Sequence, residues 1–174
     1  MEHDKLESYI REYGRDIYSF CVFLTKNRQE ADDLYQDAFL CAIEKGEPDY
    51  DDNPKAYIIS IVINIWKNRK RKYLWRKRIA DITYFDDINN YEQIPDNRMQ
   101  TDNQAISNIE IEEVRVLVAN LPDKMRVVVL MYYMEEMNIS EIAGILGISS
   151  GTVKSRLYHA RKLMVKRREK SNER

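Results

Sequence analysis

Apolar side chains recur at helical spacing along this chain, and this pattern constrains its fold more than any other feature. In the first 25 residues they follow one another at steps of four and three, which places them on one face of an amphipathic helix. These residues are Leu6, Ile10, Tyr13, Ile17, Phe20 and Leu24. Cys21 falls on the same face and acts there as a small hydrophobic residue. We therefore predict a core-facing helix at the start of the chain.

Two further helices are predicted before residue 80. Asn27 followed by Glu30 is an N-cap pattern, and Gly46-Glu47-Pro48 ends the helix that it starts. The apolar side of this helix consists of Ala31, Leu34, Ala38 and Cys41 or Ala42. Asn53-Pro54 starts a third helix, because proline at the first helical position gives up an amide that lacks an intrahelical partner.

The third segment, Lys55 to Arg78, has a strand-like composition between Ile58 and Ile63. Its polar residues nevertheless form a stripe at helical spacing, namely Ser60, Asn64, Lys67 with Asn68, and Arg71. Strict alternation would instead place Ile58, Val62 and Trp66 on the polar face. We therefore predict a buried helix with one solvated stripe, with Trp66 in the core.

Residues 81–108 are rich in Asp, Asn and Gln, contain Pro95 and show no sustained periodicity, as is typical of a linker. Helical periodicity resumes at Ile109. The predicted fold is all-α, with two small helical domains at residues 1–80 and 109–174. A flexible acidic linker, residues 81–108, joins them.

Residues 139–163 have the pattern of a helix-turn-helix. Ser140 is expected to cap a short helix, Gly147 to supply the tight turn, and Ser149 or Ser150 to cap the next helix. The apolar positions of this next helix are Val153, Leu157, Ala160 and Met164. Its outward side chains suit phosphates and base edges in a major groove. They are Lys154, Ser155, Tyr158, His159, Arg161 and Lys162.

The net charge of −1 conceals a strong segregation of charge along the chain. Residues 1–53 carry −8, residues 54–80 carry +9, residues 81–123 carry −8 and residues 124–174 carry +6. The second block combines its cations with aromatic rings, which suits single-stranded or melting DNA. Those rings are Tyr57, Trp66, Tyr73 and Trp75.

The acidic side of the second predicted helix suits a basic protein surface. It consists of Asp32, Asp33, Gln36 and Asp37. An ordinary solvated face stays open as the alternative here and for the basic block.

No enzymatic activity, metal site or cofactor is expected. Cys21 and Cys41 are isolated, and His3 and His159 stand at opposite ends of the chain, so catalytic or metal-binding arrangements have few candidates. The N-terminus lacks the apolar run of a signal peptide, and no run approaches the roughly 20 residues of a membrane span. We predict a non-enzymatic protein of the cytoplasm.

Four motifs then occur in order along the chain. They are Glu30-Ala-Asp-Asp-Leu-Tyr-Gln-Asp-Ala-Phe39, Ala56-Tyr-Ile-Ile-Ser-Ile-Val-Ile-Asn64, Leu121-Pro-Asp-Lys-Met-Arg126, and Glu141-Ile-Ala143 with Gly151-Thr-Val-Lys-Ser-Arg156. With these motifs the chain resembles the extracytoplasmic-function (ECF) class of bacterial RNA polymerase sigma factors. The resemblance implies an alternative sigma factor that binds core polymerase, directs it to specific promoters and assists DNA melting.

The resemblance also implies roles for individual residues. The second helix would bind the clamp coiled coil of the largest polymerase subunit through Asp33, Gln36 and Asp37. The third helix and the loop before it would read and open the −10 element through Asn64, Lys67, Asn68, Arg71 and Tyr50. The helix-turn-helix would read the −35 element through Thr152, Lys154, Ser155, Arg156, Tyr158 and His159. In the family, the first domain is called region 2 and the second region 4.

At four positions this chain differs from the family's usual residue: Asp37 stands in place of Glu, Tyr57 stands where Trp is common, and Ile63 and His159 stand where Arg is common. The resemblance places the linker in the polymerase cleft and adds an anti-sigma factor as a partner, with no direct membrane insertion. Two other functions stay open. A free-standing helix-turn-helix repressor or activator would bind duplex DNA as a dimer, and an adaptor or anti-termination factor would act on polymerase without reading a promoter.

Overall fold

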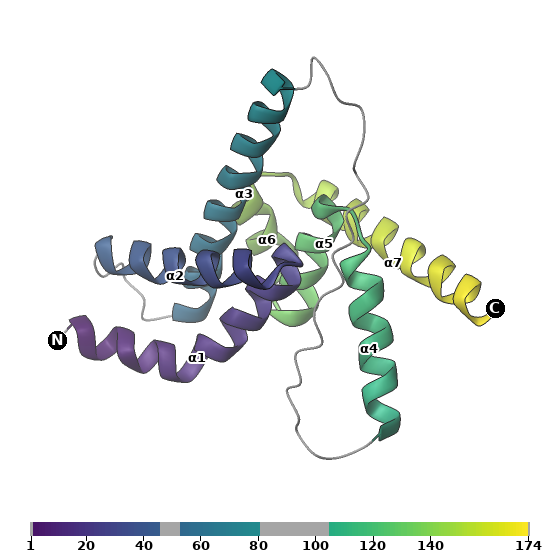
Figure 1. Ribbon diagram of the computed structural model, residues 1–174, viewed down its shortest axis with the longest axis horizontal. Helices are drawn as coiled ribbons and strands as arrows, with labels where there is room; N and C mark the ends of the chain where they lie inside the picture. Colours follow the sequence, from purple (N-terminus) through teal and green to yellow (C-terminus); the bar gives the residue numbers. More distant parts are fainter. Residues whose placement is uncertain (1, 46–52, 81–104, 174) are drawn as a thin grey trace. The chain divides into compact units, whose positions relative to one another are not determined.

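The computed structural model describes residues 2–45, 53–80 and 105–173 (Figure 1). In chain order its elements are α1 (Glu2–Thr25), α2 (Arg28–Glu44), α3 (Pro54–Ala80), α4 (Ala105–Ala119), α5 (Asp123–Val129), the π-helix η1 (Leu130–Met134), α6 (Ile139–Leu146) and α7 (Ser150–Asn172). Over these ranges no strand is present, and the isoleucine-rich run Ile58–Ile63 lies inside α3. The predicted all-α fold is therefore confirmed.

The chain divides into two units. The first consists of Met1–Cys21 and Asn27–Pro95, and the second of Val22–Lys26 and Asp96–Arg174. Most of the predicted linker, residues 81–104, lies outside the described residues. Its last four residues belong to α4, which begins at Ala105 and not near Ile109. Ile106 stands three residues before Ile109 and extends the same apolar periodicity.

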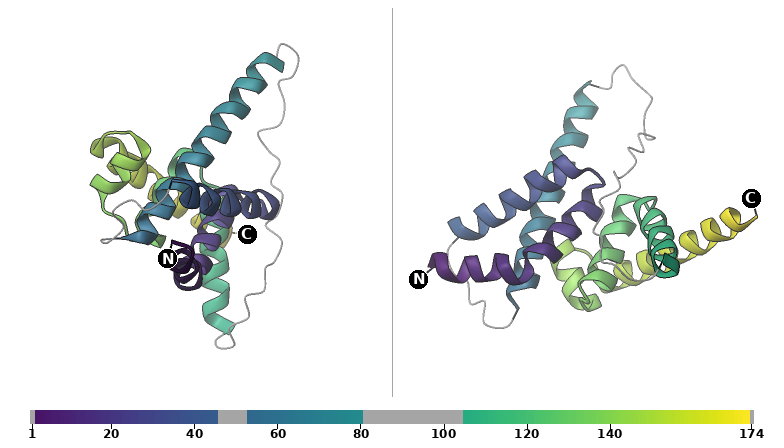
Figure 2. Two further views of the ribbon diagram at one scale, coloured as in Figure 1. Left: turned by 90° about the vertical axis from the view of Figure 1, so that its left-hand side faces the viewer. Right: turned by 60° about the horizontal axis from the view of Figure 1, so that its bottom comes forward.

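In the first unit, α2 packs on α3, and α1 runs beside α2 (Figures 1 and 2). The core residues that are fully shielded from solvent include Ile17, Phe20, Leu34, Ile59 and Val62. The predicted apolar face of α1 is buried only from Ile17 onward, and Ile10 is 41% exposed. At the level of Ile10, α1 and α2 enclose an open pocket instead of a packed core.

The starts of α2 and α3 follow the predicted caps. The Asn27 side chain accepts a hydrogen bond from the Glu30 amide at 3.1 Å. The Asn53 side chain likewise accepts one from the Ala56 amide at 3.0 Å, and Pro54 is the first residue of α3. Each cap satisfies an amide that has no partner within its helix.

In the second unit, α4, α5 and α6 all pack on α7. Its fully buried apolar residues include Val128, Met131, Ile142, Val153 and Ala160. Arg126 is also fully buried, and its guanidinium donates to the Leu121 carbonyl at 2.9 Å and to the Asp123 carboxylate at 2.6 Å. Within the motif Leu121 to Arg126, this arginine therefore stabilises the start of α5 and does not contact solvent.

Candidate nucleic-acid and protein interfaces

The acidic residues predicted to bind a protein surface lie on the outer side of α2. Asp33, Gln36 and Asp37 are exposed, whereas Leu34 and Ala38 are fully buried. Asp37 forms an ion pair with Arg69 of α3. We call the three exposed residues the α2 acidic face. One of its two carboxylates is thus held by a cation from the neighbouring helix.

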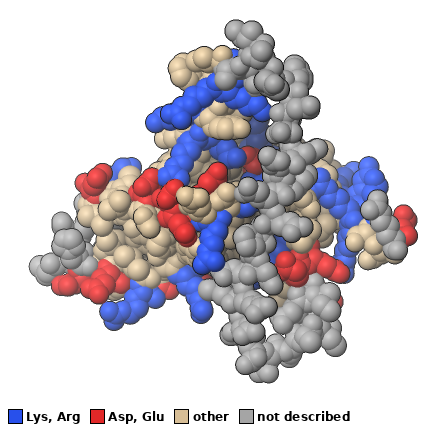
Figure 3. All heavy atoms as spheres, viewed as in Figure 1, with Lys and Arg blue, Asp and Glu red and all other residues tan. Residues whose placement is uncertain are grey.

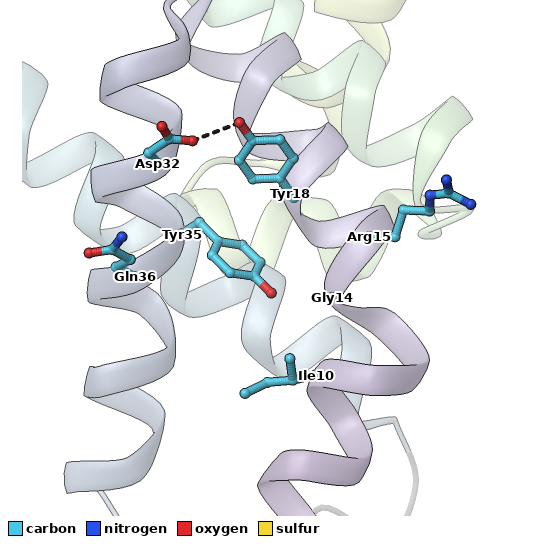
Figure 4. A pocket seen from close by; sticks show the side chains of 7 residues that line it. All are labelled: Ile10, Gly14, Arg15, Tyr18, Asp32, Tyr35 and Gln36. Atoms are coloured by element: carbon cyan, nitrogen blue, oxygen red, sulfur yellow. Dashed lines mark hydrogen bonds between the residues drawn. The ribbon is translucent and has the colours of Figure 1, made fainter. Parts of the chain in front are cut away.

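Next to this face, α1 and α2 enclose a pocket of about 340 Å³ (Figure 4). Its lining consists of Ile10, Gly14, Arg15, Tyr18, Asp32, Tyr35 and Gln36. The Tyr18 hydroxyl donates to the Asp32 carboxylate at 2.6 Å, and the rings of Tyr18 and Tyr35 meet edge to face. Asp32 is therefore tied to α1, in contrast to our prediction that it shares the acidic face with Asp33.

Two tyrosines of this pocket have perturbed titration. The hydrogen bond to Asp32, with a smaller effect of burial, raises the pKa of Tyr18. Burial raises the pKa of Tyr35. Gly14 lies against the Tyr35 hydroxyl, and a Cβ atom at this position would be 2.8 Å from that oxygen. The absence of a side chain at position 14 therefore allows the close approach of α1 and Tyr35.

The polar stripe predicted on α3 is solvent-accessible. Asn64, Asn68 and Arg71 are exposed, and Lys67 is half-buried. The Arg71 guanidinium donates to the Asn68 amide oxygen at 2.9 Å and so orients that amide. Ile63 is fully buried, so this position belongs to the core and not to the stripe. Tyr50, the remaining residue predicted to contact the −10 element, lies outside the described residues.

The rest of α3 combines cations with aromatic rings. Trp66 is only 7% exposed, as predicted for a core residue, and the Lys70 ammonium lies 6.0 Å from its ring centroid. Tyr73 and Trp75, in contrast, are more than 60% exposed. Figure 3 shows Lys and Arg side chains gathered over the C-terminal part of α3. This surface offers charge for phosphates and rings on which unpaired bases can stack.

The first helix of the helix-turn-helix, α6, is capped by Asn138 and not by Ser140 as we predicted. The Asn138 side-chain oxygen accepts a hydrogen bond from the Glu141 backbone amide at 2.9 Å. The Glu141 carboxylate accepts one from the Asn138 backbone amide at 2.8 Å. This reciprocal arrangement requires the cap to stand three residues before Glu141. Ser140 therefore already lies in the first turn of α6.

The turn between α6 and α7 has the predicted form. Gly147 adopts the left-handed conformation with φ of 66°, which suits a residue without a side chain. Ser149 is the N-cap of α7, and its hydroxyl accepts from the Thr152 amide at 3.1 Å. The same hydroxyl is hydrogen-bonded to the Thr152 hydroxyl at 2.9 Å. These bonds fix the direction in which α7 leaves the turn.

On α7, Val153, Leu157 and Ala160 are at most 3% exposed and face the core, as predicted. The residues predicted to read DNA lie on the outer side: Lys154, Ser155, Tyr158 and His159 are exposed, and Thr152 and Arg156 are half-buried. The Lys162 ammonium lies 4.8 Å from the Tyr158 ring centroid. Arg161, also predicted to point outward, is exposed but donates to the Tyr133 hydroxyl at 2.6 Å within the same unit.

Two negative observations apply to these described ranges. No group of three or more His, Cys, Asp or Glu side chains there is arranged to hold a metal ion. Among the helices of the same ranges, none combines the length and the apolar character needed to cross a bilayer.

Comparison with known proteins identifies the family to which both units belong. Residues 9–76 match the family described as sigma-70 region 2, and residues 111–164 match sigma-70, region 4, so together the two matches cover more than half of the chain. The chain is 28% identical over 172 residues to the ECF RNA polymerase sigma factor SigW of Bacillus subtilis, with 95% of this chain and 89% of SigW covered. It is 27% identical over 157 residues to SigM of Bacillus subtilis, with 90% of each chain covered. The chain belongs to the ECF class of RNA polymerase sigma factors.

Two solved structures share the fold of this sigma factor. One is the sigma factor RpoE of Bartonella quintana, in complex with the anti-sigma factor NepR, with a TM-score of 0.62 and 19% identity over 91% of this chain and 94% of RpoE. The other is CnrH in complex with the cytosolic domain of CnrY, with a TM-score of 0.62 and 17% identity over 96% of this chain and 89% of CnrH. Both agree with the all-helical fold.

As a sigma factor, this protein directs RNA polymerase to promoters. The region 2 match contains α2 and most of α3, and the region 4 match contains α5, α6 and the N-terminal part of α7. All of the residues predicted to bind polymerase or DNA fall within these two matches.

Three residues of this sigma factor have contacts that the sequence analysis missed: Tyr18, Arg69 and Arg126. Asp123 and Arg126 stand three residues apart on one helix, a spacing that signals an ion pair. The pairs Tyr18–Asp32 and Arg69–Asp37 join separate helices, and local spacing contains no signal for them.

Proposed function

We propose that this sigma factor is a non-catalytic, cytoplasmic subunit that binds core polymerase and the −10 element with its first unit and the −35 element with its second. One observation carries this assignment. The α2 acidic face and the polar stripe of α3 are both exposed on helices that pack on each other. One small unit thereby offers an acidic surface to a protein and a basic surface to DNA.

For polymerase binding, the support is the combination of charge and exposure on α2. Asp33 and Gln36 point to solvent from a helix whose other side is core. A carboxylate beside an amide can accept and donate hydrogen bonds to a basic helical surface. Leu40, one turn beyond Gln36, is 56% exposed and would add apolar contact at the same interface.

For the −10 element, the stripe of α3 has the chemistry of base readout and phosphate binding. The Asn64 and Asn68 amides can bond base edges, and Lys67 and Arg71 can bind phosphates. Single-stranded bases expose these edges fully, so this stripe favours the open form of the element. Melting assistance is part of the proposal for this reason.

For the −35 element, the outer side of α7 supports major-groove readout. Lys154 and Arg156 can bond guanine, and Ser155 can bond several bases. The left-handed conformation of Gly147 and the cap formed by Ser149 set the direction of α7 in the turn before it. A well-ordered recognition helix loses little conformational freedom when it binds.

An anti-sigma factor is the proposed regulatory partner. Two proteins that share this fold were solved as complexes. RpoE was solved with the anti-sigma factor NepR, and CnrH was solved with the cytosolic domain of CnrY. A partner of this kind would compete for the surfaces of the first unit, whose exposed apolar residues include Leu40 and Ile43.

Reconstituted transcription tests the proposal. Purified protein is mixed with sigma-free core polymerase and a promoter library, and specific initiation is scored. Asp33→Arg should weaken co-purification with core polymerase by at least about tenfold, since like charges across an interface cost several kcal/mol. Glu7→Arg, the same reversal on the exposed side of α1, is the matched control and should co-purify normally.

Two results would contradict this proposal. Tight, specific binding of duplex DNA without polymerase and without initiation would favour a free-standing helix-turn-helix regulator. Unchanged binding of core polymerase by Asp33→Arg would remove α2 from the interface.

A further inference from the structure

Arg69 joins the two surfaces of the first unit. Its guanidinium forms a hydrogen bond and an ion pair with the Asp37 carboxylate, and the two side chains are 39% and 53% exposed. Asp37 belongs to the α2 acidic face. Arg69 follows Asn68 directly in the basic part of α3, although it was absent from the residues predicted to bind the −10 element. The ion pair between Arg69 and Asp37 therefore joins one residue of the α2 acidic face to one residue of the basic part of α3.

The position of Arg69 on α3 allows it to serve either surface. Successive residues of a helix are about 100° apart around its axis. Arg69 therefore lies about 160° around the helix from Lys67 and Arg71. It is outside the stripe and shares its side of α3 with the exposed Lys72 and Arg76. A long arginine side chain can turn from Asp37 toward a phosphate bound beside Lys72 and Arg76.

The energies favour an exchangeable pair. An ion pair between exposed side chains contributes little to stability, so its separation costs little when each partner gains a better one. A polymerase cation could replace Arg69 at Asp37. An arginine that reaches a DNA phosphate gains from counterion release, a gain that the pair with Asp37 does not offer.

We propose that Arg69 is a promoter-phosphate contact that Asp37 holds back in the free protein and releases when polymerase occupies the α2 acidic face. This inference rests on the proposed function, because it takes that face as the polymerase-binding surface. The exchange links polymerase binding to DNA binding within one unit. It also lowers the affinity of the free sigma factor for DNA.

Binding of the free protein to non-specific duplex DNA tests the first half of the inference. Fluorescence anisotropy is measured between 50 and 200 mM salt for wild type, Asp37→Asn and Glu44→Gln. Glu44→Gln removes the same charge from the same helix and leaves the pair intact, so it controls for net charge. All the substituted side chains are exposed, and thermal unfolding checks that each variant is folded.

Asp37→Asn should bind DNA more tightly than Glu44→Gln, and its slope of log affinity against log salt should be steeper by about 0.9, the value for one extra phosphate contact. Over this salt range the difference corresponds to about a threefold change in the affinity ratio. The gain should vanish when Asp37→Asn is combined with Arg69→Gln. Equal slopes for Asp37→Asn and Glu44→Gln, or a gain that persists without Arg69, would overturn the inference.

The second half is tested with holoenzyme on a promoter. Arg69→Gln should still bind core polymerase, but the salt slope of promoter binding should fall by about 0.9 relative to wild type. An unchanged slope would show that Arg69 reaches no phosphate in the complex.

The two proposals fail in different ways. If Asp33→Arg binds core polymerase normally, the polymerase interface is misassigned, whatever the free-protein measurement shows. If Asp33→Arg loses polymerase while Asp37→Asn and Glu44→Gln behave alike, the function stands and the exchange is wrong.

Discussion

Asp32 and Asp33 are adjacent acidic residues on α2, but they have different surroundings. The Asp32 carboxylate accepts a hydrogen bond from the Tyr18 hydroxyl at 2.6 Å and so connects α2 to α1. Asp33, in contrast, is exposed to solvent. Adjacent helical residues are about 100° apart, so a single step along the chain separates a structural carboxylate from one available to a partner. Gly14 belongs to the same contact between helices, because it leaves room for the Tyr35 hydroxyl.

We predict that the effect of Gly14→Ala depends on the residue at position 35. Alanine is preferred over glycine inside a helix by about 1 kcal/mol, but its Cβ would meet the Tyr35 hydroxyl at 2.8 Å. In a Tyr35→Phe background the substitution should raise the free energy of unfolding by about 1 kcal/mol. With Tyr35 present the gain should be lost or reversed. Urea unfolding followed by tryptophan fluorescence measures this, because Trp66 and Trp75 both belong to the first unit.

At the scale of elements, periodicity and capping account for most of what is observed. The run Ile58–Ile63 has β-branched composition but lies in α3, because its flanking polar residues fall at helical spacing. Capping chemistry selected Asn138 over Ser140, since only Asn138 is placed to exchange two hydrogen bonds with Glu141. Both Asn and Ser are common caps, and the partner three residues later decides between them.

We expect Asn138→Ala to destabilise the second unit by about 1 kcal/mol, the usual cost of a lost N-cap. Ser140→Ala is the matched control and should have little effect, because Ser140 is exposed in the first turn. Circular dichroism should report the shift in unfolding, while tryptophan fluorescence, which reports on the first unit, should not change. Equal destabilisation by both substitutions would argue against the assigned cap.

At the scale of the whole molecule, the near-neutral charge results from blocks with separate proposed tasks. The first acidic block, residues 1–53, contains the α2 acidic face, the most basic block is α3, and the C-terminal basic block includes α7. A net charge of −1 limits the attraction of the free protein to DNA, and the pair between Asp37 and Arg69 would limit it further. Promoter binding would then depend on polymerase contacts.

The two units should consequently fail in different steps of initiation. Lys154→Ala should weaken binding to the −35 element by roughly 1–3 kcal/mol if a bidentate base contact is lost. DNA opening should be unaffected once the promoter complex has formed.

Asn64→Ala should leave the recruitment of polymerase to the promoter intact and reduce the reactivity of unpaired thymines to permanganate. Normal permanganate reactivity in Asn64→Ala would place the melting surface elsewhere.

The sequence by itself determined the helices, most of their boundaries and the exposed faces of α2, α3 and α7. These depend on local spacing, because helical periodicity and caps involve residues within a few positions of each other. Ile106 carries such a signal for the start of α4 at Ala105, because it stands at helical spacing from Ile109. The hydrogen bond of Tyr18 to Asp32, the exposure of Ile10 and the pairing of Arg69 with Asp37 were decided only by tertiary structure. Each depends on which side chains of a neighbouring helix lie close by. Helix packing decides this, and the positions of the residues along the chain do not.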